Sequence, residues 1–399
     1  MRKLLFWFAI LIPTVAFAQR TEKLSVKGQI KGLAAGDTLR FQSVNQPGYD
    51  LSPGFVVIAG KDGKFAYSGS QPHSTLYIMD ILPVKGEKMP PVDRMGEELL
   101  IRNGDKLIIT GERQFWAFCK IDGGVYDNPL LKRSMGIWDS LGIIRSGYLQ
   151  QIDLAREKKD TKAVSKYTDL FNEFRLSSAE ADSLEKVYYA LPGTSELSAI
   201  KILGNSSYRP VQEVKAAYEA LPEAVKNSYH GKLLGTRTAK LLTLEPGRPA
   251  PDFTLINADG SVSLSDFKGR YLLIYHWGMC PGSMQIDPEV RDFYDKADKS
   301  KIAVIGVTEY RASVEKLNRE ASPSDTVLGM NLKDNTDCML SHHYPDYDMT
   351  IPGNDLVGET FIFGGLPYFV LIDPAGKMVD RGFHKIFYKA REILTKKEE

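Results

Sequence analysis

Residues 271–283 read YLLIYHWGMCPGS, and this stretch decides the fold of the C-terminal part of the chain. The run Tyr271–Tyr275 is apolar enough for a strand at the centre of a sheet that is covered on both faces. Cys280 follows it closely, and Pro281 and Gly282 come next. Proline suits the first position of a helix because its missing N–H is not needed there. The stretch therefore predicts a buried strand, a turn that carries a cysteine, and the start of a helix.

Further strand signals flank this stretch on both sides. A second apolar run, Ile302–Val307, follows the expected helix, so the unit is strand-helix-strand and parallel. Upstream, Asp259-Gly260 is typical of a hairpin turn. Near the end of the chain, Pro367 precedes the apolar run Tyr368–Ile372, and a C-terminal helix follows. We expect a mixed α/β domain with an antiparallel edge over residues 246–399.

The regions ahead of this domain differ from it and from each other in the spacing of their apolar residues. Residues 24–127 alternate short apolar runs with turn signals, which is typical of an antiparallel β-sandwich. We expect Cys119 in this region to be a small buried residue. From residue 128 to 245 the apolar spacing changes to that of helices, which predicts a helical connector. The expected fold class is multidomain: an antiparallel β-sandwich, a helical connector and an α/β domain.

Residues 1–18 have the features of an export signal. Arg2 and Lys3 form a charged start, Leu4–Val15 is apolar, and Ala16–Ala18 fits the small-x-small cleavage rule. The apolar run is shorter than the roughly 20 residues that a bilayer span needs. We therefore expect a cleaved signal peptide, a mature chain with no transmembrane segment, and a periplasmic location.

The overall composition excludes several kinds of partner and site. Lys and Arg number 51 and Asp and Glu 50, so a net charge of +1 offers no field to attract nucleic acid or a membrane. The chain has three cysteines: Cys119, Cys280 and Cys338. They cannot form a disulfide framework, and without a CxxC pair they do not suggest a zinc site. His342-His343, with Asp346 and Asp348 nearby, is expected to be solvated surface. We expect no metal and no cofactor.

Cys280 is the candidate nucleophile on chemical grounds alone. A thiol where a buried strand meets a helix start faces the free N–H groups and the positive end of the helix dipole. Both favour the thiolate, which is the reactive form of cysteine. The Pro and Gly that follow favour an exposed turn over tight packing.

Several motifs in the C-terminal region occur in a familiar order. They are Ala-Pro-Asp-Phe (250–253), Leu-Ser-Asp-Phe-Lys-Gly (264–269), Trp-Gly-Met-Cys (277–280), Gly-Leu-Pro (365–367) and Leu-Ile-Asp-Pro-Ala-Gly-Lys (371–377). With them, residues 246–395 resemble the exported thioredoxin-like thiol-disulfide oxidoreductases of the TlpA and ResA type. The preceding region resembles the β-sandwich domain of unknown function that is often fused ahead of such domains in Bacteroidetes.

This resemblance implies a thioredoxin fold and a set of roles. Cys280 would be the attacking thiol, and Pro367 the cis-proline that faces it. Glu309 falls where the family can keep a glutamate near the thiol. At the end of a central strand and poorly hydrated, its carboxyl group should have a raised pKa and could move the thiol proton. The partners implied are protein or small-molecule disulfides and thiols, together with an external reductant.

The chain departs from the family at the second active-site cysteine, where it has Ser283. A hydroxyl can donate a hydrogen bond to a thiolate, but it cannot attack a mixed disulfide, because exchange requires a thiolate. The site would then be a monothiol one, Cys-Pro-Gly-Ser. An external thiol would release its mixed disulfide, or Cys338 would do so if the fold brings it near.

Two other classes of function stay open from the sequence. A thiol peroxidase would reduce peroxide at Cys280, but Leu273 and Trp277 occupy the Pro and Thr positions of the peroxiredoxin pattern Pro-x-x-x-Thr-x-x-Cys. A thioredoxin fold without redox activity could serve as a binding module, since a fold does not establish a function. Disulfide exchange by the wild type and by Cys280→Ala separates these classes.

Overall fold

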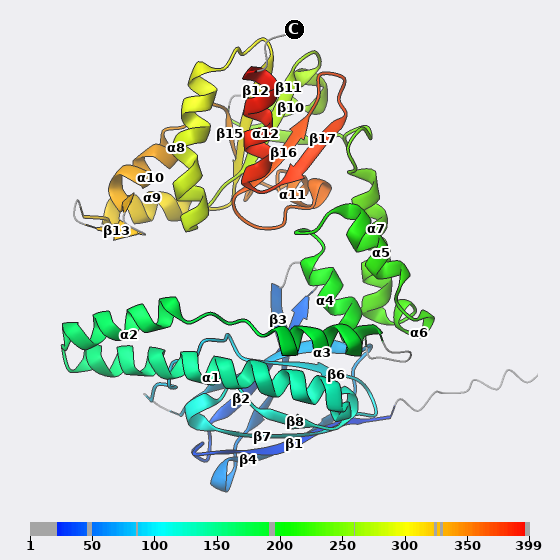
Figure 1. Ribbon diagram of the computed structural model, residues 1–399, viewed down its shortest axis with the longest axis vertical. Helices are drawn as coiled ribbons and strands as arrows, with labels where there is room; N and C mark the ends of the chain where they lie inside the picture. Colours follow the sequence, from blue (N-terminus) through cyan, green and yellow to red (C-terminus); the bar gives the residue numbers. More distant parts are fainter. Residues whose placement is uncertain are drawn as a thin grey trace, which may run out of the picture. The chain divides into compact units, whose positions relative to one another are not determined.

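The computed structural model describes residues 22–45, 50–84, 87–190, 196–258, 260–322, 325–327 and 330–395. The expected signal peptide, residues 1–18, lies outside these residues. The described chain folds as two compact units, which divide between residues 190 and 196 (Figure 1). None of the helices in these ranges is long and apolar enough to cross a membrane.

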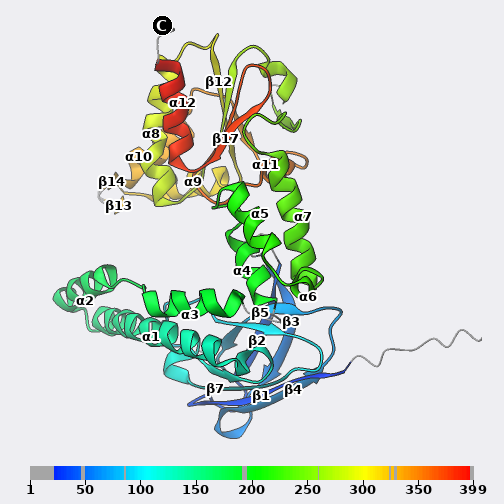
Figure 2. The ribbon, with the colours of Figure 1, turned by 45° about the vertical axis from the view of Figure 1, so that its right-hand side comes forward.

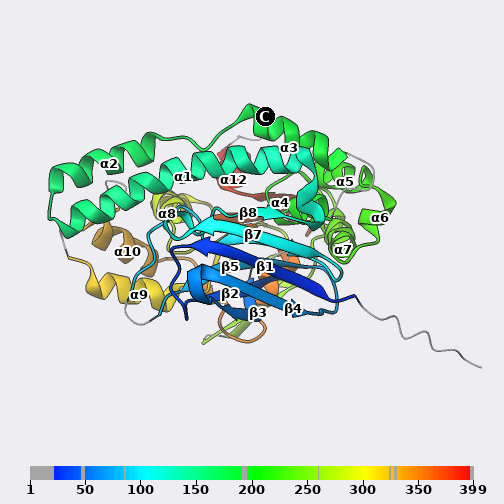
Figure 3. The ribbon, with the colours of Figure 1, turned by 90° about the horizontal axis from the view of Figure 1, so that it is seen from below.

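The first unit contains two four-stranded sheets. Its strands are β1 (Leu24–Lys31), β2 (Thr38–Asn45), β3 (Asp50–Ile58), β4 (Lys64–Gly69), β5 (Thr75–Leu82), β6 (Glu97–Ile101), β7 (Lys106–Glu112) and β8 (Lys120–Asp122). The strand orders are β4-β1-β7-β8 and β3-β2-β5-β6 (Figure 3). Phe55 of β3 stacks on Tyr67 of β4, with ring centroids 4.0 Å apart, so the two sheets pack together as a sandwich.

One strand pairing differs from the sequence expectation. β1 pairs with β4 antiparallel but with β7 parallel, so the sandwich is not wholly antiparallel. The turn signals reveal only hairpins between successive strands, whereas β1 and β7 are separated by five strands along the chain. Within the sandwich, Cys119 is fully buried, as expected.

Three helices complete the first unit: α1 (Pro129–Glu157), α2 (Thr161–Glu173) and α3 (Ala179–Ala190). Helix α1 begins at Pro129 because the side chain of Asn128 accepts hydrogen bonds from the first free backbone N–H groups. Trp138 of α1 donates from Nε1 to Glu185 of α3 at 2.8 Å, which ties the two helices together.

The remaining helices of the expected connector belong to the second unit. They are α4 (Leu197–Asn205), α5 (Val211–Glu219), α6 (Glu223–Lys226) and α7 (Tyr229–Thr243). Leu203, Val214 and Leu234 share a hydrophobic core with Leu272 and Val370 of the C-terminal sheet. The helical segment 128–245 is thus divided between the two units.

The rest of the second unit is an α/β domain. Its elements are β9 (Thr254–Asn257), β10 (Gly260–Ser263), β11 (Tyr271–His276), α8 (Pro281–Lys296), β12 (Ile302–Thr308), α9 (Arg311–Glu320), β13 (Thr326–Val327), β14 (Met330–Asn331), α10 (Leu332–Leu340), β15 (Asp346–Asp348), α11 (Leu356–Phe361), β16 (Tyr368–Ile372), β17 (Met378–Gly382) and α12 (His384–Thr395). The main sheet has the order β15-β12-β11-β16-β17. As expected, β11 and β12 are parallel, and β16 and β17 form an antiparallel edge.

Strand β11 is buried on both faces of this sheet. Leu272 and Ile274 point into the core shared with α4–α7, whereas Leu273 and Tyr275 point into the core shared with α8 and α12. Figure 2 shows α8 and α12 on one side of the sheet and α5, α7 and α11 on the other. Because β11 and β12 are parallel, the segments after them, which carry Cys280 and Glu309, meet at one edge.

Candidate active site

Cys280 lies at the N-terminus of α8, just beyond the carboxyl end of β11. Its sulfur accepts a hydrogen bond from the backbone N–H of Ser283 at 3.3 Å, and Pro281 is the first residue of the helix. The free N–H groups and the positive end of the helix dipole favour a negative charge on this sulfur. Cys280 is also partly exposed. The sulfur therefore lies at a helix N-terminus in a position that a reaction partner can reach.

Ser283 lies directly against this sulfur. Its Oγ is 3.3 Å from Cys280 Sγ, and its side chain is fully buried. The Ser283 Oγ accepts from the Cys280 thiol and also from the backbone N–H of Gly278 at 3.2 Å. A hydroxyl group thus stands within contact distance of the sulfur, where a second thiol would have to lie to attack a mixed disulfide.

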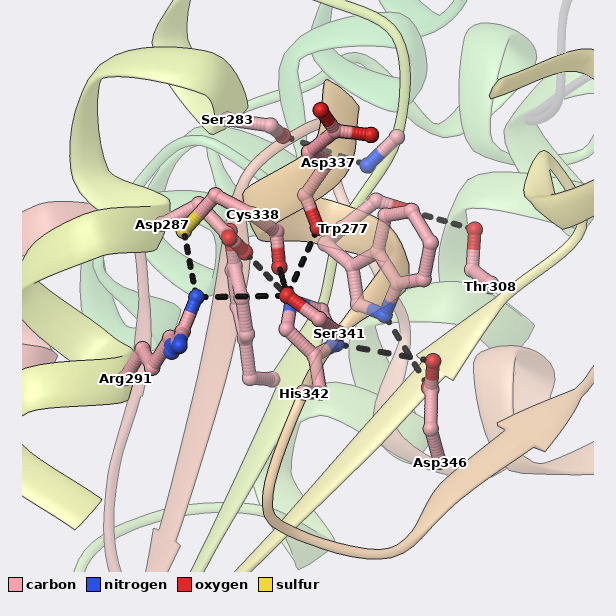
Figure 4. Close-up of polar contacts among 12 residues, drawn as sticks. Trp277, Ser283, Asp287, Arg291, Thr308, Asp337, Cys338, Ser341, His342 and Asp346 are labelled. Carbon is pink, nitrogen blue, oxygen red and sulfur yellow. Dashed lines mark hydrogen bonds and ion pairs between the residues drawn. The ribbon is translucent and has the colours of Figure 1, made fainter. Parts of the chain in front are cut away.

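The turn that carries Cys280 is held in place by Trp277. The Trp277 indole is fully buried, and its Nε1 donates to Asp346 Oδ1 at 3.0 Å (Figure 4). The carbonyl of Trp277 accepts from Thr308 Oγ1 at 2.8 Å. These bonds anchor the turn to the ends of β12 and β15, so the position of Cys280 is fixed by the sheet.

Pro367 lies beside the active-site turn. The Leu366–Pro367 peptide bond is cis, which confirms the expected isomer. A Cβ added at Gly282 would lie 3.1 Å from Pro367 Cδ and 3.9 Å from both Cys280 Sγ and His384 Cε1. The open side of Gly282 therefore faces the sulfur, the proline ring and the imidazole together.

Glu309 follows β12 at the same edge of the sheet. The expectation that its carboxyl group has a raised pKa is wrong. Burial raises the pKa, but the hydrogen bond and charge of His276, together with hydrogen bonds from the backbone of Glu309 and the side chain of Tyr310, outweigh burial and lower the pKa. His276 Nε2 lies 2.9 Å from Glu309 Oε2. The carboxyl group therefore forms an ion pair with the histidine when that ring is protonated. A proton-relay role for Glu309 remains a prediction, without the raised pKa that motivated it.

Cys338, the possible resolving thiol, lies on α10 away from Cys280. Its half-buried sulfur lies 3.8 Å from Arg291 Nη1, and burial, followed by the charge of Asp287, raises the pKa of the thiol (Figure 4). Asp287 comes seven residues after Cys280 on α8, about 10 Å along the helix at 1.5 Å per residue. A disulfide requires Cα atoms about 4.4–6.8 Å apart. The Cys338 sulfur contacts Arg291, farther along α8 than Cys280, and both thiols are free in the structure.

Comparisons with known proteins find similarity in the C-terminal part of the chain. Residues 246–381 match the model of the AhpC/TSA family. Solved structures similar to this chain include the thioredoxin domain of a thiol-disulfide oxidoreductase from Bacteroides vulgatus (22% identity, 38% of this chain and 99% of that chain, TM-score 0.28). A thiol:disulfide interchange protein from Bacteroides sp. is also similar (22% identity, 39% and 95%, TM-score 0.29), as is a thiol-disulfide oxidoreductase from Bacteroides fragilis (21% identity, 37% and 100%, TM-score 0.27). No curated protein matches the chain.

The C-terminal domain is thioredoxin-like. Its sheet order, the cysteine at the start of α8 and the proline loop before β16 all agree with that description.

His342 of the thioredoxin-like domain is not the solvated residue that the sequence suggested. Its side chain is 1% exposed, and Nε2 lies 2.8 Å from Asp287 Oδ1, while Nδ1 lies 3.5 Å from Asp346 Oδ2 (Figure 4). Burial alone lowers the pKa of His342, but the hydrogen bonds and charges of the two carboxylates outweigh burial and raise it to about 9. His343, in contrast, is half exposed and pairs with Asp295.

Two residues at the edge of the active site were missed by sequence reasoning. His384, at the start of α12, lies across Gly282 from the sulfur. Tyr310 covers Gly278, since a Cβ there would meet Tyr310 Cδ2 at 2.6 Å. Burial first, and then the charge of Glu309, raises the pKa of Tyr310. Their positions in the sequence could have indicated them: Tyr310 follows the end of β12 and His384 the end of β17, and active-site residues of open α/β sheets often lie just after strand ends.

Proposed function

We propose that this protein exchanges thiols and disulfides through the single cysteine Cys280. The observation that carries the proposal is the site itself: a partly exposed sulfur at a helix N-terminus, with the Ser283 hydroxyl 3.3 Å away and Pro367 beside the same turn. The match of residues 246–381 to the AhpC/TSA family agrees with thiol chemistry in this domain.

The first step forms a mixed disulfide. The Cys280 thiolate attacks one sulfur of a substrate disulfide, a new S–S bond forms to Cys280, and the other substrate sulfur leaves as a thiolate, which takes up a proton. No electrons are gained or lost overall in this exchange. The N–H of Ser283 and the Ser283 hydroxyl hold Cys280 Sγ in place before the attack.

The second step requires a thiol from outside the site. An external thiolate attacks the substrate sulfur of the mixed disulfide, a new S–S bond forms between the external thiol and the substrate, and Cys280 leaves as a thiolate. When that external thiol is a reductant, its oxidation supplies the electrons for net reduction. Ser283 cannot take this part, because an alcohol is not ionised at neutral pH.

We further propose that this exchange takes place in the periplasm, after removal of residues 1–18. The charged start, apolar run and Ala-Phe-Ala motif of the first eighteen residues support export. N-terminal sequencing of the protein recovered from a periplasmic fraction tests this proposal, with Gln19 expected as the first residue. An intact Met1 in the recovered protein contradicts it.

The exchange itself is tested with a peptide disulfide and mass spectrometry. Wild type and Cys338→Ser should form an adduct that maps to Cys280, whereas Cys280→Ala should form none at the active site. Cys338→Ser is the matched control, because it removes the other partly exposed thiol. If the folded wild type forms no adduct at Cys280, the proposal is wrong and the binding-module alternative is favoured.

A further inference from the structure

A pocket of about 780 Å³ opens next to the candidate active site, within the second unit. One wall is formed by the segment between α4 and α5 and by the residues after α7, and the other by the end of β17 and the start of α12. Its basic and aromatic lining residues are Tyr208, Arg209, Arg381, Phe383, His384 and Lys385. The helical segment ahead of the thioredoxin-like domain therefore contributes to a cavity at that domain's functional edge.

The pocket reaches the reactive sulfur through His384. This residue lines the pocket, and its Cε1 lies 3.9 Å from the point where a Gly282 Cβ would be. Cys280 Sγ lies at the same distance from that point. Cys280 Sγ and His384 Cε1 are therefore separated by at most the sum of these two distances, about 8 Å. One molecule can therefore place a group in the pocket and its disulfide at Cys280.

The charge of the pocket is positive. Of its two carboxylates, Asp380 is paired with Lys389 Nζ at 2.8 Å, whereas Glu245 accepts from the neutral side chain of Gln212 and keeps its charge, against the three cations Arg209, Arg381 and Lys385. Within the described ranges, Arg209, His384 and Lys385 form no ion pair. Arg209 and Lys385 are therefore cations that face the pocket without a carboxylate partner among the described residues.

Arg381 adds to this charge from one wall of the pocket. It donates to the hydroxyl of Tyr368 and to the carbonyl of Ile362, and its buried Nε has no hydrogen-bond partner. Arg237 lies near it, and burial, followed by the positive charge of Arg381, lowers the pKa of Arg237 to about 10. Two guanidinium groups held close together make the local potential favourable for an anion.

Two aromatic rings form a flat surface beside these cations. Tyr208 stacks on Phe383 with ring centroids 5.5 Å apart and planes 7° apart. Tyr208 is 56% exposed, and its hydroxyl lies 3.4 Å from the Cβ position of Gly365, in the loop that leads to Pro367. The rings therefore connect the helical segment to the proline loop and offer an apolar face for a ligand.

We propose that this pocket binds carboxylate groups of the thiol or disulfide that reacts at Cys280, so that the protein prefers anionic substrates. The proposal rests on the proposed function and adds a substrate class to it. Unpaired arginine and lysine side chains recognise carboxylates through charge-assisted hydrogen bonds. Both an acidic peptide and a small carboxylated disulfide carry the required chemistry.

The test compares anionic and neutral disulfides of similar size. The probes are 5,5′-dithiobis(2-nitrobenzoate), a dianion, and 4,4′-dithiodipyridine, which is neutral, together with a Glu-rich peptide disulfide and its Gln counterpart. The rate constant of adduct formation at Cys280 is measured for each probe, in wild type and in the double variant Arg209→Gln/Lys385→Gln. Lys301→Gln is the matched control, because Lys301 is exposed and lies before β12, at the opposite end of that strand from the site.

We expect the ratio of anionic to neutral rate constants to fall about three- to tenfold in the double variant and to stay unchanged in Lys301→Gln. A fall confined to the peptide pair identifies an acidic peptide as the ligand, and a fall in both pairs identifies the carboxylate alone. An unchanged ratio in both pairs overturns the inference. The neutral probe reports separately on the proposed function, since a lack of any adduct at Cys280 contradicts that function and not merely the preference.

Discussion

The hydroxyl oxygen of Ser283 lies 3.3 Å from the sulfur of Cys280. This distance places a non-nucleophilic group where a resolving thiol would have to be, and it explains why a mixed disulfide at Cys280 should persist. The serine is fully buried and also bonds the backbone N–H of Gly278, so it supports the turn as well as the sulfur.

Ser283→Cys should convert this site into one that resolves its own mixed disulfide. A thiol at this position attacks within the molecule, so the turnover of a peptide disulfide under excess external thiol should rise on the order of tenfold or more. Ser283→Ala is the control and should not raise turnover. Equal turnover in wild type and in a folded Ser283→Cys protein would contradict the expected geometry.

Gly282→Ala should slow the reaction of Cys280 without a large loss of stability. The added Cβ lies 3.1 Å from Pro367 Cδ and 3.9 Å from both Cys280 Sγ and His384 Cε1, so it adds bulk beside the sulfur. Alanine is the better helix former by about 1 kcal/mol, which offsets part of the tight contact. Alkylation of Cys280 by a bulky reagent should slow severalfold.

The control for that variant is Gln285→Ala, an exposed change on the same helix. It should leave the alkylation rate as in the wild type. If a small reagent such as iodoacetamide is slowed as strongly as a bulky one, the added methyl group acts on the sulfur itself and not on access to it.

Local sequence patterns sufficed for the elements that carry the reactive sulfur. The apolar run of β11, the Pro at the start of α8 and the Gly-Leu-Pro before β16 each reflect a constraint within a few residues of sequence. Such constraints can be read without tertiary information, because they depend on backbone geometry and on alternation of buried positions. Cys280, Ser283 and Pro367 were accordingly found together where they were expected.

The electrostatics of the site could not be predicted in this way. The pKa of Glu309 depends on His276, which lies 33 residues away in the sequence. His342 pairs with Asp287, 55 residues away, because α8 and the segment after α10 pack together. Its polar neighbours, His343 and Asp346, are typical of a surface loop, so the local pattern favoured the wrong environment.

Glu309→Gln tests the corrected pKa of that carboxyl group. Because the folded-state pKa is lowered, the ionised Glu309 contributes stability above the ordinary carboxyl pKa, and this stability is lost as the pH falls through the folded value. The side chain is 38% exposed, so the effect should be about 1 kcal/mol or less. Wild type should lose more stability than Glu309→Gln between pH 5 and pH 3, as measured by urea unfolding. A raised pKa would give the opposite sign.

His342 should make the stability of the thioredoxin-like domain fall on the alkaline side of neutrality. Its pKa rises from 6.5 to about 9 in the folded protein, so its protonated form contributes stability that is fully present below about pH 6.5 and is lost as the pH passes through 9. A shift of this size corresponds to a contribution on the order of 3 kcal/mol. Urea unfolding midpoints at pH 6, 7.5 and 9 measure it.

In this series, wild type should lose stability steadily, whereas His342→Gln should start lower and change less over the same range. His343→Gln removes the exposed neighbour and should follow the wild type, because that imidazole is half exposed and pairs only at the surface. If His342→Gln does not fold, an NMR titration of the His342 ring in the wild type gives the same answer. A midpoint near 6.5 there would mean that Asp287 and Asp346 do not hold the ring in its charged form.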